Sequence, residues 1–138
     1  MREVGKLDHA AKSFKRAVEI LPSYSEAHNK LGVTFIDLKK YEDAIEHLEW
    51  AVAYKYNFAE AHNNLGVANT ELGQINNAAK NFKKATEINP SYTLAHLNLG
   101  VTLLDLGQKD EAVKCFEQVI SIEPDNALAH EKLKELNS

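Results

Sequence analysis

A chain of 138 residues with 44% hydrophobic and 26% charged residues is typical of one soluble globular unit. No apolar run approaches the roughly 18 residues that a membrane span needs, and the first residues form no apolar signal segment. The net charge of −4 argues against a general nucleic-acid binder, and a single cysteine excludes a disulfide framework and a multi-cysteine zinc site. We therefore expect no membrane insertion, no nucleic-acid partner and, by default, a cytoplasmic location.

The chain repeats itself every 34 residues. Gly32, Gly66 and Gly100 share one column of this repeat. The other columns that recur at the same step include Ala27, Ala61, Ala95 and Ala129; His28, His62, His96 and His130; and Leu31, Leu65, Leu99 and Leu133. Agreement of several columns at one fixed period is the mark of a repeat architecture, in which stacked units build one continuous core.

Each repeat has the pattern of two amphipathic helices. Apolar residues recur at helical spacing around Leu65 in the first helix and around Phe82 in the second. In chain order we predict one domain over residues 1–138: a partial repeat over 4–24 that has only its second helix, full repeats over 25–58, 59–92 and 93–126, and a capping helix over 127–137.

Glycines and small polar residues mark the predicted ends of these helices. Gly73 and Gly107 fit the left-handed position that ends a helix, Gly5 stands in the same column, and Lys39 fills it once. Small polar residues precede the first helices and are the predicted N-caps: Ser23, Asn57, Ser91 and Asp125.

The motifs A-H-N-N-L-G-V-A over residues 61–68, E-L-G over 71–73 and A-x-x-x-F-x-x-A over 78–85, followed by Pro90, resemble the tetratricopeptide repeat family. The resemblance covers nearly the whole chain. It implies an all-α fold, a right-handed α-solenoid of antiparallel helix pairs, and a non-catalytic module that binds other proteins without a cofactor.

The resemblance also implies which residues line the concave, peptide-binding face. They are Asn29, Lys30, Val33, Asn63, Asn64, Val67, Leu94, Leu97, Asn98, Val101 and Leu104. Asn64 and Asn98 share a column, and this resembles the asparagine ladder of peptide-binding and glycosyltransferase-associated members. An amide both donates to and accepts from an extended backbone. The alternatives are that these asparagines are only tolerated on a solvated helix, and that the leucines are buried under the terminal helix.

The charges expected on this face are mostly negative. Its acidic residues are Glu26, Asp37, Glu60, Glu71, Asp105, Glu131 and Glu135, and its basic residues are Lys30 and Lys132. A cleft lined by charges of one sign focuses the electrostatic potential, so the sequence favours a partner peptide with basic flanks. The leucines on the same face favour apolar anchors in that peptide. The sequence argues against the carboxylate clamp of some co-chaperones in this family. The resemblance places basic clamp residues at three positions that are occupied here by Glu60, Leu94 and Asn98.

One interpretation of the exposed aromatic residues Trp50, Tyr54 and Tyr56 is a second contact patch; the alternative is a lone surface tryptophan packed over its neighbours. With the uncovered face of the partial first repeat, around Phe14, this patch supports an alternative: a structural scaffold that self-assembles, so that a homo-oligomer is possible. A further alternative is that the chain is the repeat domain of a larger enzyme, such as a glycosyltransferase.

No catalytic or metal-binding constellation is predicted. Equivalent histidines of successive repeats lie on the order of 10 Å apart, too far to share one zinc ion. His47 stands in a polar column and is expected to be an isolated surface residue. Cys115 is expected to be exposed but unreactive, because Glu111, one turn away, would raise the pKa of its thiol.

Overall fold

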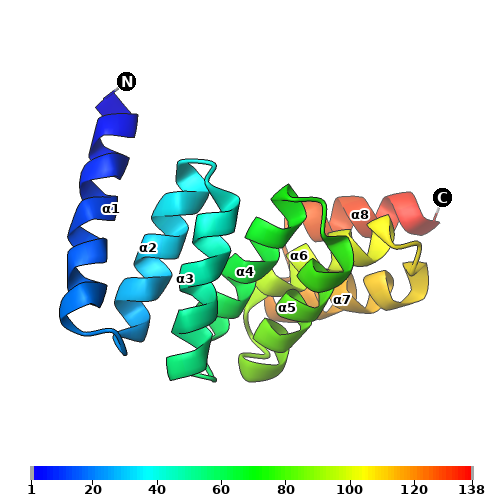
Figure 1. Ribbon diagram of the computed structural model, residues 1–138. Coiled ribbons are helices and arrows are strands. Elements are labelled where there is room, and N and C mark those ends of the chain that lie inside the picture. The colour runs from blue at the N-terminus through cyan, green and yellow to red at the C-terminus, as the bar shows by residue number, and fades with distance from the viewer. Residues whose placement is uncertain (1, 138) are drawn as a thin grey trace.

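The computed structural model describes residues 2–137, and within this range the chain is helical (Figure 1). The helices are α1 (Arg2–Ile20), α2 (Ser25–Asp37), α3 (Tyr41–Tyr54), α4 (Ala59–Glu71), α5 (Ile75–Ile88), α6 (Thr93–Asp105), α7 (Lys109–Ile122) and α8 (Ala127–Asn137). Residues 1 and 138, at the ends of the predicted domain, lie outside the described residues. None of the described helices has the length and apolar character to cross a bilayer.

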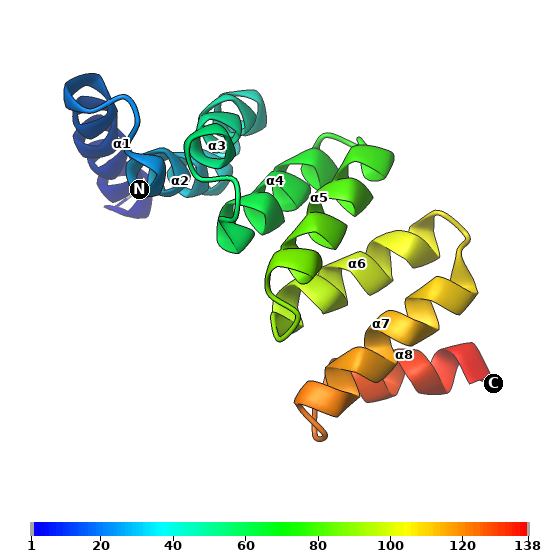
Figure 2. The ribbon, with the colours of Figure 1, turned by 90° about the horizontal axis from the view of Figure 1, so that it is seen from below.

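Neighbouring helices pack against each other in chain order. The pairs α2–α3, α4–α5 and α6–α7 stack side by side, while α1 packs on α2 and α8 packs on α7. Figure 2 shows the pairs stepping from α1 at one end to α8 at the other. The predicted all-α solenoid of antiparallel helix pairs is therefore confirmed.

The glycine column lies where the two helices of a pair make their closest contact. A Cβ atom built on Gly66 would stand 2.4 Å from Cε1 of Phe82, which is far inside van der Waals contact. Gly32 meets Leu48 in the same way at 2.5 Å, and Gly100 meets Phe116 at 2.8 Å. Glycine is required here because the large side chain of the second helix occupies the space where a Cβ would stand.

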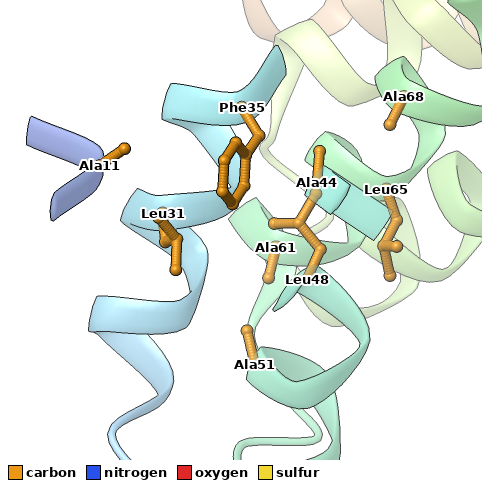
Figure 3. Packing of buried hydrophobic residues seen from close by; sticks show 9 residues of the cluster. All are labelled: Ala11, Leu31, Phe35, Ala44, Leu48, Ala51, Ala61, Leu65 and Ala68. Carbon is orange, nitrogen blue, oxygen red and sulfur yellow. The ribbon is translucent and has the colours of Figure 1, made fainter. Parts of the chain in front are cut away.

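Alanine, leucine and phenylalanine fill the space between the helices. Figure 3 shows Leu31 and Phe35 of α2 beside Leu48 of α3 and Leu65 of α4, with alanines between them. Leu31 and Leu48 are fully buried. A second cluster around Phe82 and Phe116 continues this core through α8. The columns of glycine and alanine thus allow the helices to approach closely, and the columns of leucine and phenylalanine fill the space between them.

The turns agree with the sequence in part. Lys39, Gly73 and Gly107 have φ of 61°, 76° and 77°, as predicted for residues that end a helix. The prediction for Gly5 is wrong, because α1 is one helix from Arg2 and runs through this position.

The predicted N-caps are also wrong. The first three caps are Tyr24, Phe58 and Tyr92, and none makes a side-chain cap bond. Before α8, the side-chain oxygen of Asn126 accepts from the Ala129 amide at 2.9 Å. Each helix begins one residue later than the small polar residue suggests, because the turn before it is closed by a backbone bond such as Tyr24 N–H to the Leu21 carbonyl.

Candidate functional site

Two pairs of asparagines join the first helices of successive repeats. The side-chain amide of Asn64 on α4 donates to Oδ1 of Asn29 on α2 at 3.0 Å. One repeat further, Asn98 on α6 donates to Oδ1 of Asn63 on α4 at 3.1 Å. Asn29 and Asn63 are only 4% and 2% exposed, whereas Asn64 and Asn98 are half-buried. The predicted ladder, Asn64 and Asn98, therefore forms an outer row whose amides donate to a buried row, Asn29 and Asn63, which were predicted to line the concave face.

We call the surface around the outer row the ladder face. It consists of Lys30, Val33, Asn64, Val67, Leu94, Asn98 and Val101. The bond to the buried row uses one N–H of Asn64 and one of Asn98. Each outer amide keeps a second N–H and its oxygen for another partner. The intramolecular bonds thus fix the orientation of these amides without exhausting them.

The apolar residues of the predicted site divide into two groups. Leu97 and Leu104 pack against the core cluster that includes Ala129 of α8. Leu94 and Val101, by contrast, are 52% and 37% exposed. Leu94 and Val101 therefore present the most apolar surface to a ligand, and Val33, Val67, Leu97 and Leu104 are half-buried.

The acidic side chains predicted for the concave face are exposed. Seven predicted carboxylates lie on the surface: Glu26, Asp37, Glu60, Glu71, Asp105, Glu131 and Glu135. Lys132, one of the two predicted basic residues, lies 3.8 Å from Glu135. The pKa of Tyr92 is raised, first by burial and then by the negative charge of Glu60. The field of Glu60 on α4 therefore reaches the start of α6.

The predicted aromatic patch is only partly assembled. Trp50 and Tyr54 stack with their ring centroids 5.7 Å apart, and both are nearly half exposed. Tyr56 does not join this stack. The ammonium group of Lys84 instead lies 4.2 Å from its ring centroid and bonds its hydroxyl. Trp50 and Tyr54 thus form one surface, and Tyr56 belongs to the contact between α5 and the turn before α4.

The histidine column closes the turns between repeats, a role that its spacing alone did not reveal. Nε2 of each histidine lies within hydrogen-bond distance of the carbonyl six residues earlier. The four pairs are His28 with Pro22 at 2.6 Å, His62 with Tyr56 at 3.0 Å, His96 with Pro90 at 2.8 Å and His130 with Pro124 at 2.7 Å. A carbonyl only accepts, so Nε2 carries the proton in each case.

His47 and Cys115 are less exposed than predicted. His47 is half-buried and stacks on His28, with the two Nδ1 atoms 3.3 Å apart. Cys115 is half-buried as well; burial first and the Glu111 carboxylate second raise the pKa of its thiol to about 11. A thiol with that pKa stays protonated at neutral pH. Among the described residues, no three potential ligands gather around a possible metal position.

Comparison with known proteins agrees with this geometry. Models of the tetratricopeptide repeat match residues 2–48, 34–73 and 70–136. A crystal structure of MamA is 30% identical and superimposes with a TM-score of 0.90, over 98% of this chain and 79% of that one. This chain belongs to the tetratricopeptide repeat family. A search of curated protein sequences found no significant match.

Two further tetratricopeptide repeat structures share the fold. The Arabidopsis OM64 domain is 25% identical with a TM-score of 0.77, over 82% of this chain and 93% of that one. The first domain of Spaghetti (RPAP3), bound to the HSP90 peptide SRMEEVD, is 24% identical with a TM-score of 0.78, over 82% and 90%. Tetratricopeptide repeat domains are typically protein–protein interaction modules and are usually non-catalytic.

Proposed function

We propose that this tetratricopeptide repeat domain is a non-catalytic adaptor whose ladder face holds an extended peptide segment of a partner protein. The observation that carries the proposal is the pair of half-buried amides of Asn64 and Asn98, each held by a buried asparagine of the preceding repeat. Their remaining donors and acceptors match the alternating N–H and C=O groups of an extended backbone. Because these amides are already oriented, binding loses little of their side-chain entropy.

Exposed apolar residues flank these amides. Leu94 and Val101 lie on the same helix as Asn98 and remain in contact with solvent. They lie seven residues apart on α6, about 10.5 Å along its axis, so separate apolar side chains of the peptide would cover them. The peptide is therefore anchored by apolar side chains and positioned through its main chain.

Charge selects the class of peptide. The RPAP3 domain binds SRMEEVD, a peptide rich in carboxylates. The ladder face of this chain is bordered by exposed carboxylates such as Glu60 and Glu71. Such a field repels an acidic tail and attracts lysine and arginine. We therefore propose a partner segment with apolar anchors and basic flanks.

The test is a pull-down from the source lysate, followed by titration of the captured segment and of SRMEEVD. Three variants are compared: Leu94→Ser with Val101→Ser, Asn64→Ala with Asn98→Ala, and Trp50→Ala as the matched control. We expect both ladder-face variants to weaken binding of the captured segment at least about tenfold, and Trp50→Ala to bind it as the wild type does. For SRMEEVD, we expect the ladder-face variants to cause no such loss of binding. Capture that depends on Trp50 and not on the ladder face would refute the proposal.

A second candidate function is self-assembly, which the exposure of α1 favours. Phe14 is half-buried, whereas Leu48, Phe82 and Phe116 of the same column are 0–2% exposed. Ile20 and Leu21, at the end of α1, are 74% and 52% exposed. A second copy that packs on α1 would cover this face. Sedimentation equilibrium over a wide concentration range tests it; a monomer throughout removes this candidate.

A further inference from the structure

A groove lies between the second helices α5 and α7, with α6 as its floor. Figure 2 shows α6 between these two helices. The groove has a volume of about 630 Å³, within the range of ligand-binding pockets. The corresponding hollow one repeat earlier, between α3 and α5, has only about 310 Å³. The α5–α7 groove thus has about twice the volume of its α3–α5 counterpart.

Two substitutions in the repeat pattern make the floor of this groove apolar where its α3–α5 counterpart is polar. Between α3 and α5, the side chain of Asn69 donates to Oδ1 of Asn81 at 2.7 Å, and this polar pair occupies the hollow. At the positions 34 residues later stand Leu103 and Cys115. Neither forms a hydrogen bond across the groove, and with Leu99 they give it an apolar floor.

Three lysines border this floor. Lys80 and Lys83 project from α5, and Lys114 from α7. Among the described residues the single ion pair is Lys132–Glu135, so no carboxylate lies within 4 Å of any of these three ammonium groups. Glu87 and Glu111 also line the groove, which leaves one net positive charge in a chain of net charge −4. The groove is therefore apolar at its centre and weakly basic at its rim.

The groove and the ladder face use opposite sides of α6. Leu99 and Leu103 point to the groove, whereas Leu94, Asn98 and Val101 belong to the ladder face. At 100° per residue, the two sets lie about half a turn apart around the helix. A ligand in the groove would leave the ladder face open.

We propose that the α5–α7 groove is a second binding site, which takes an acidic amphipathic helix of a partner protein. Its apolar ridge would lie on Leu99, Leu103 and Cys115, in the manner of a helix bound in a hydrophobic groove. Its flanking carboxylates would pair with the lysines at the rim, which form no ion pair within the described part of the chain. This site does not depend on the proposed function of the ladder face, and it prefers the opposite charge. The domain can therefore join an acidic helix and a basic segment.

The probe is a fluorescent peptide of about 15 residues, four helical turns, with leucines on one face and glutamates elsewhere. Its control is the same peptide with serine in place of leucine. Anisotropy measures binding at low and high salt, and amide NMR shifts locate it. We expect the leucine peptide to bind at least about tenfold more tightly than the control, more weakly at high salt, and to shift resonances of α5 and α7.

Two variants of the groove are compared with one of the ladder face. Leu103→Asn with Cys115→Asn copies the Asn69–Asn81 pair of the preceding repeat, and Lys80→Glu with Lys83→Glu and Lys114→Glu changes only exposed residues. We expect each groove variant to lose at least about tenfold in affinity, and Leu94→Ser with Val101→Ser to bind normally. Equal binding of both peptides, unchanged binding by the charge variant, or shifts confined to the ladder face would overturn the proposal. Shifts confined to the ladder face would also count against its proposed preference for a basic segment, whereas the first two outcomes leave that proposal unaffected.

Discussion

Asn98 donates its side-chain hydrogen bond at 3.1 Å to Asn63, a residue of the preceding repeat that is only 2% exposed. Asn64 makes the same bond to Asn29 one repeat earlier. A buried amide oxygen is costly to leave without a donor. These bonds therefore hold neighbouring first helices in register, and they orient the outer amides at the same time.

The first prediction concerns this coupling. Asn98→Ala leaves the Asn63 oxygen without its donor, so we expect the free energy of unfolding to fall by about 1–3 kcal/mol. Asn63→Ala should also destabilise, but the double variant should lose less than the sum of the two, by about 1 kcal/mol. Urea denaturation of the four proteins measures the coupling. Strictly additive effects would show that the bond does not join the repeats.

The second prediction uses two glycines with opposite surroundings. Gly66→Ala places a methyl group 2.4 Å from the Phe82 ring, and we expect a net loss of about 1–2 kcal/mol, since overpacking exceeds the gain in helix propensity. Gly5 lies inside α1, and a Cβ atom added to it would meet nothing within 4 Å. Gly5→Ala should therefore stabilise by up to about 1 kcal/mol. Thermal unfolding compares the two; destabilisation by both would contradict this account of the glycine column.

The third prediction concerns the one lysine with positive φ. Lys39 has φ of 61° in the turn where Gly73 and Gly107 stand in the next two repeats. The left-handed region costs an L-residue about 1–2 kcal/mol, and the greater freedom of glycine in the unfolded chain offsets part of this. We expect Lys39→Gly to stabilise by about 0.5–1 kcal/mol in chemical denaturation. Gly73→Lys is the converse control and should destabilise; a loss of stability in Lys39→Gly would mean that its side chain has a role of its own.

The fold was predictable because its signals are periodic. Gly32, Gly66 and Gly100 recur at one step, and each has the close contact that requires glycine. Gly5 shares a column with Gly73 but lies inside the continuous helix α1, so it does not end a helix. A repeat pattern assigns the same role to every member of a column, and Gly5 shows that one member can have a different backbone conformation.

The site was less predictable because it depends on contacts between columns. Asn64 and Asn98 were recognisable as a polar column, but their bonds to Asn29 and Asn63 join residues 35 apart, one more than the repeat. The stacking of His47 on His28 likewise joins a residue expected at the surface to a buried member of the histidine column. Such pairs follow from how helices cross, which periodicity along one helix does not specify.

The fourth prediction is a dependence of stability on pH that involves His47. The pKa of His47 is lowered below its usual 6.5, mainly by burial and to a smaller extent by the neighbouring His28. The unfolded chain therefore takes up the proton more readily, and the stability from the neutral ring is lost as the pH falls from 6.5 through the folded pKa. His62, whose pKa burial also lowers, adds to the same trend.

Urea denaturation at about pH 7.5 and about pH 5.5 measures this loss. We expect His47→Gln to lose less stability than the wild type between the two conditions. His9 is exposed, so His9→Gln should behave as the wild type. The titrating groups that act on His47 besides His28 are Glu46, Asp43 and Lys15. Identical pH dependence in His47→Gln and the wild type would assign the acid sensitivity to other groups.

The most direct test of the ladder face is an NMR titration that follows the side-chain amides of Asn64 and Asn98 as the captured partner segment is added. If the outer amides bind the peptide backbone, their side-chain N–H resonances shift with the same affinity as the bulk binding curve, while the indole N–H of Trp50 stays in place. Shifts at Trp50 with unchanged Asn64 and Asn98 amides would contradict the account and move the binding site to the aromatic surface.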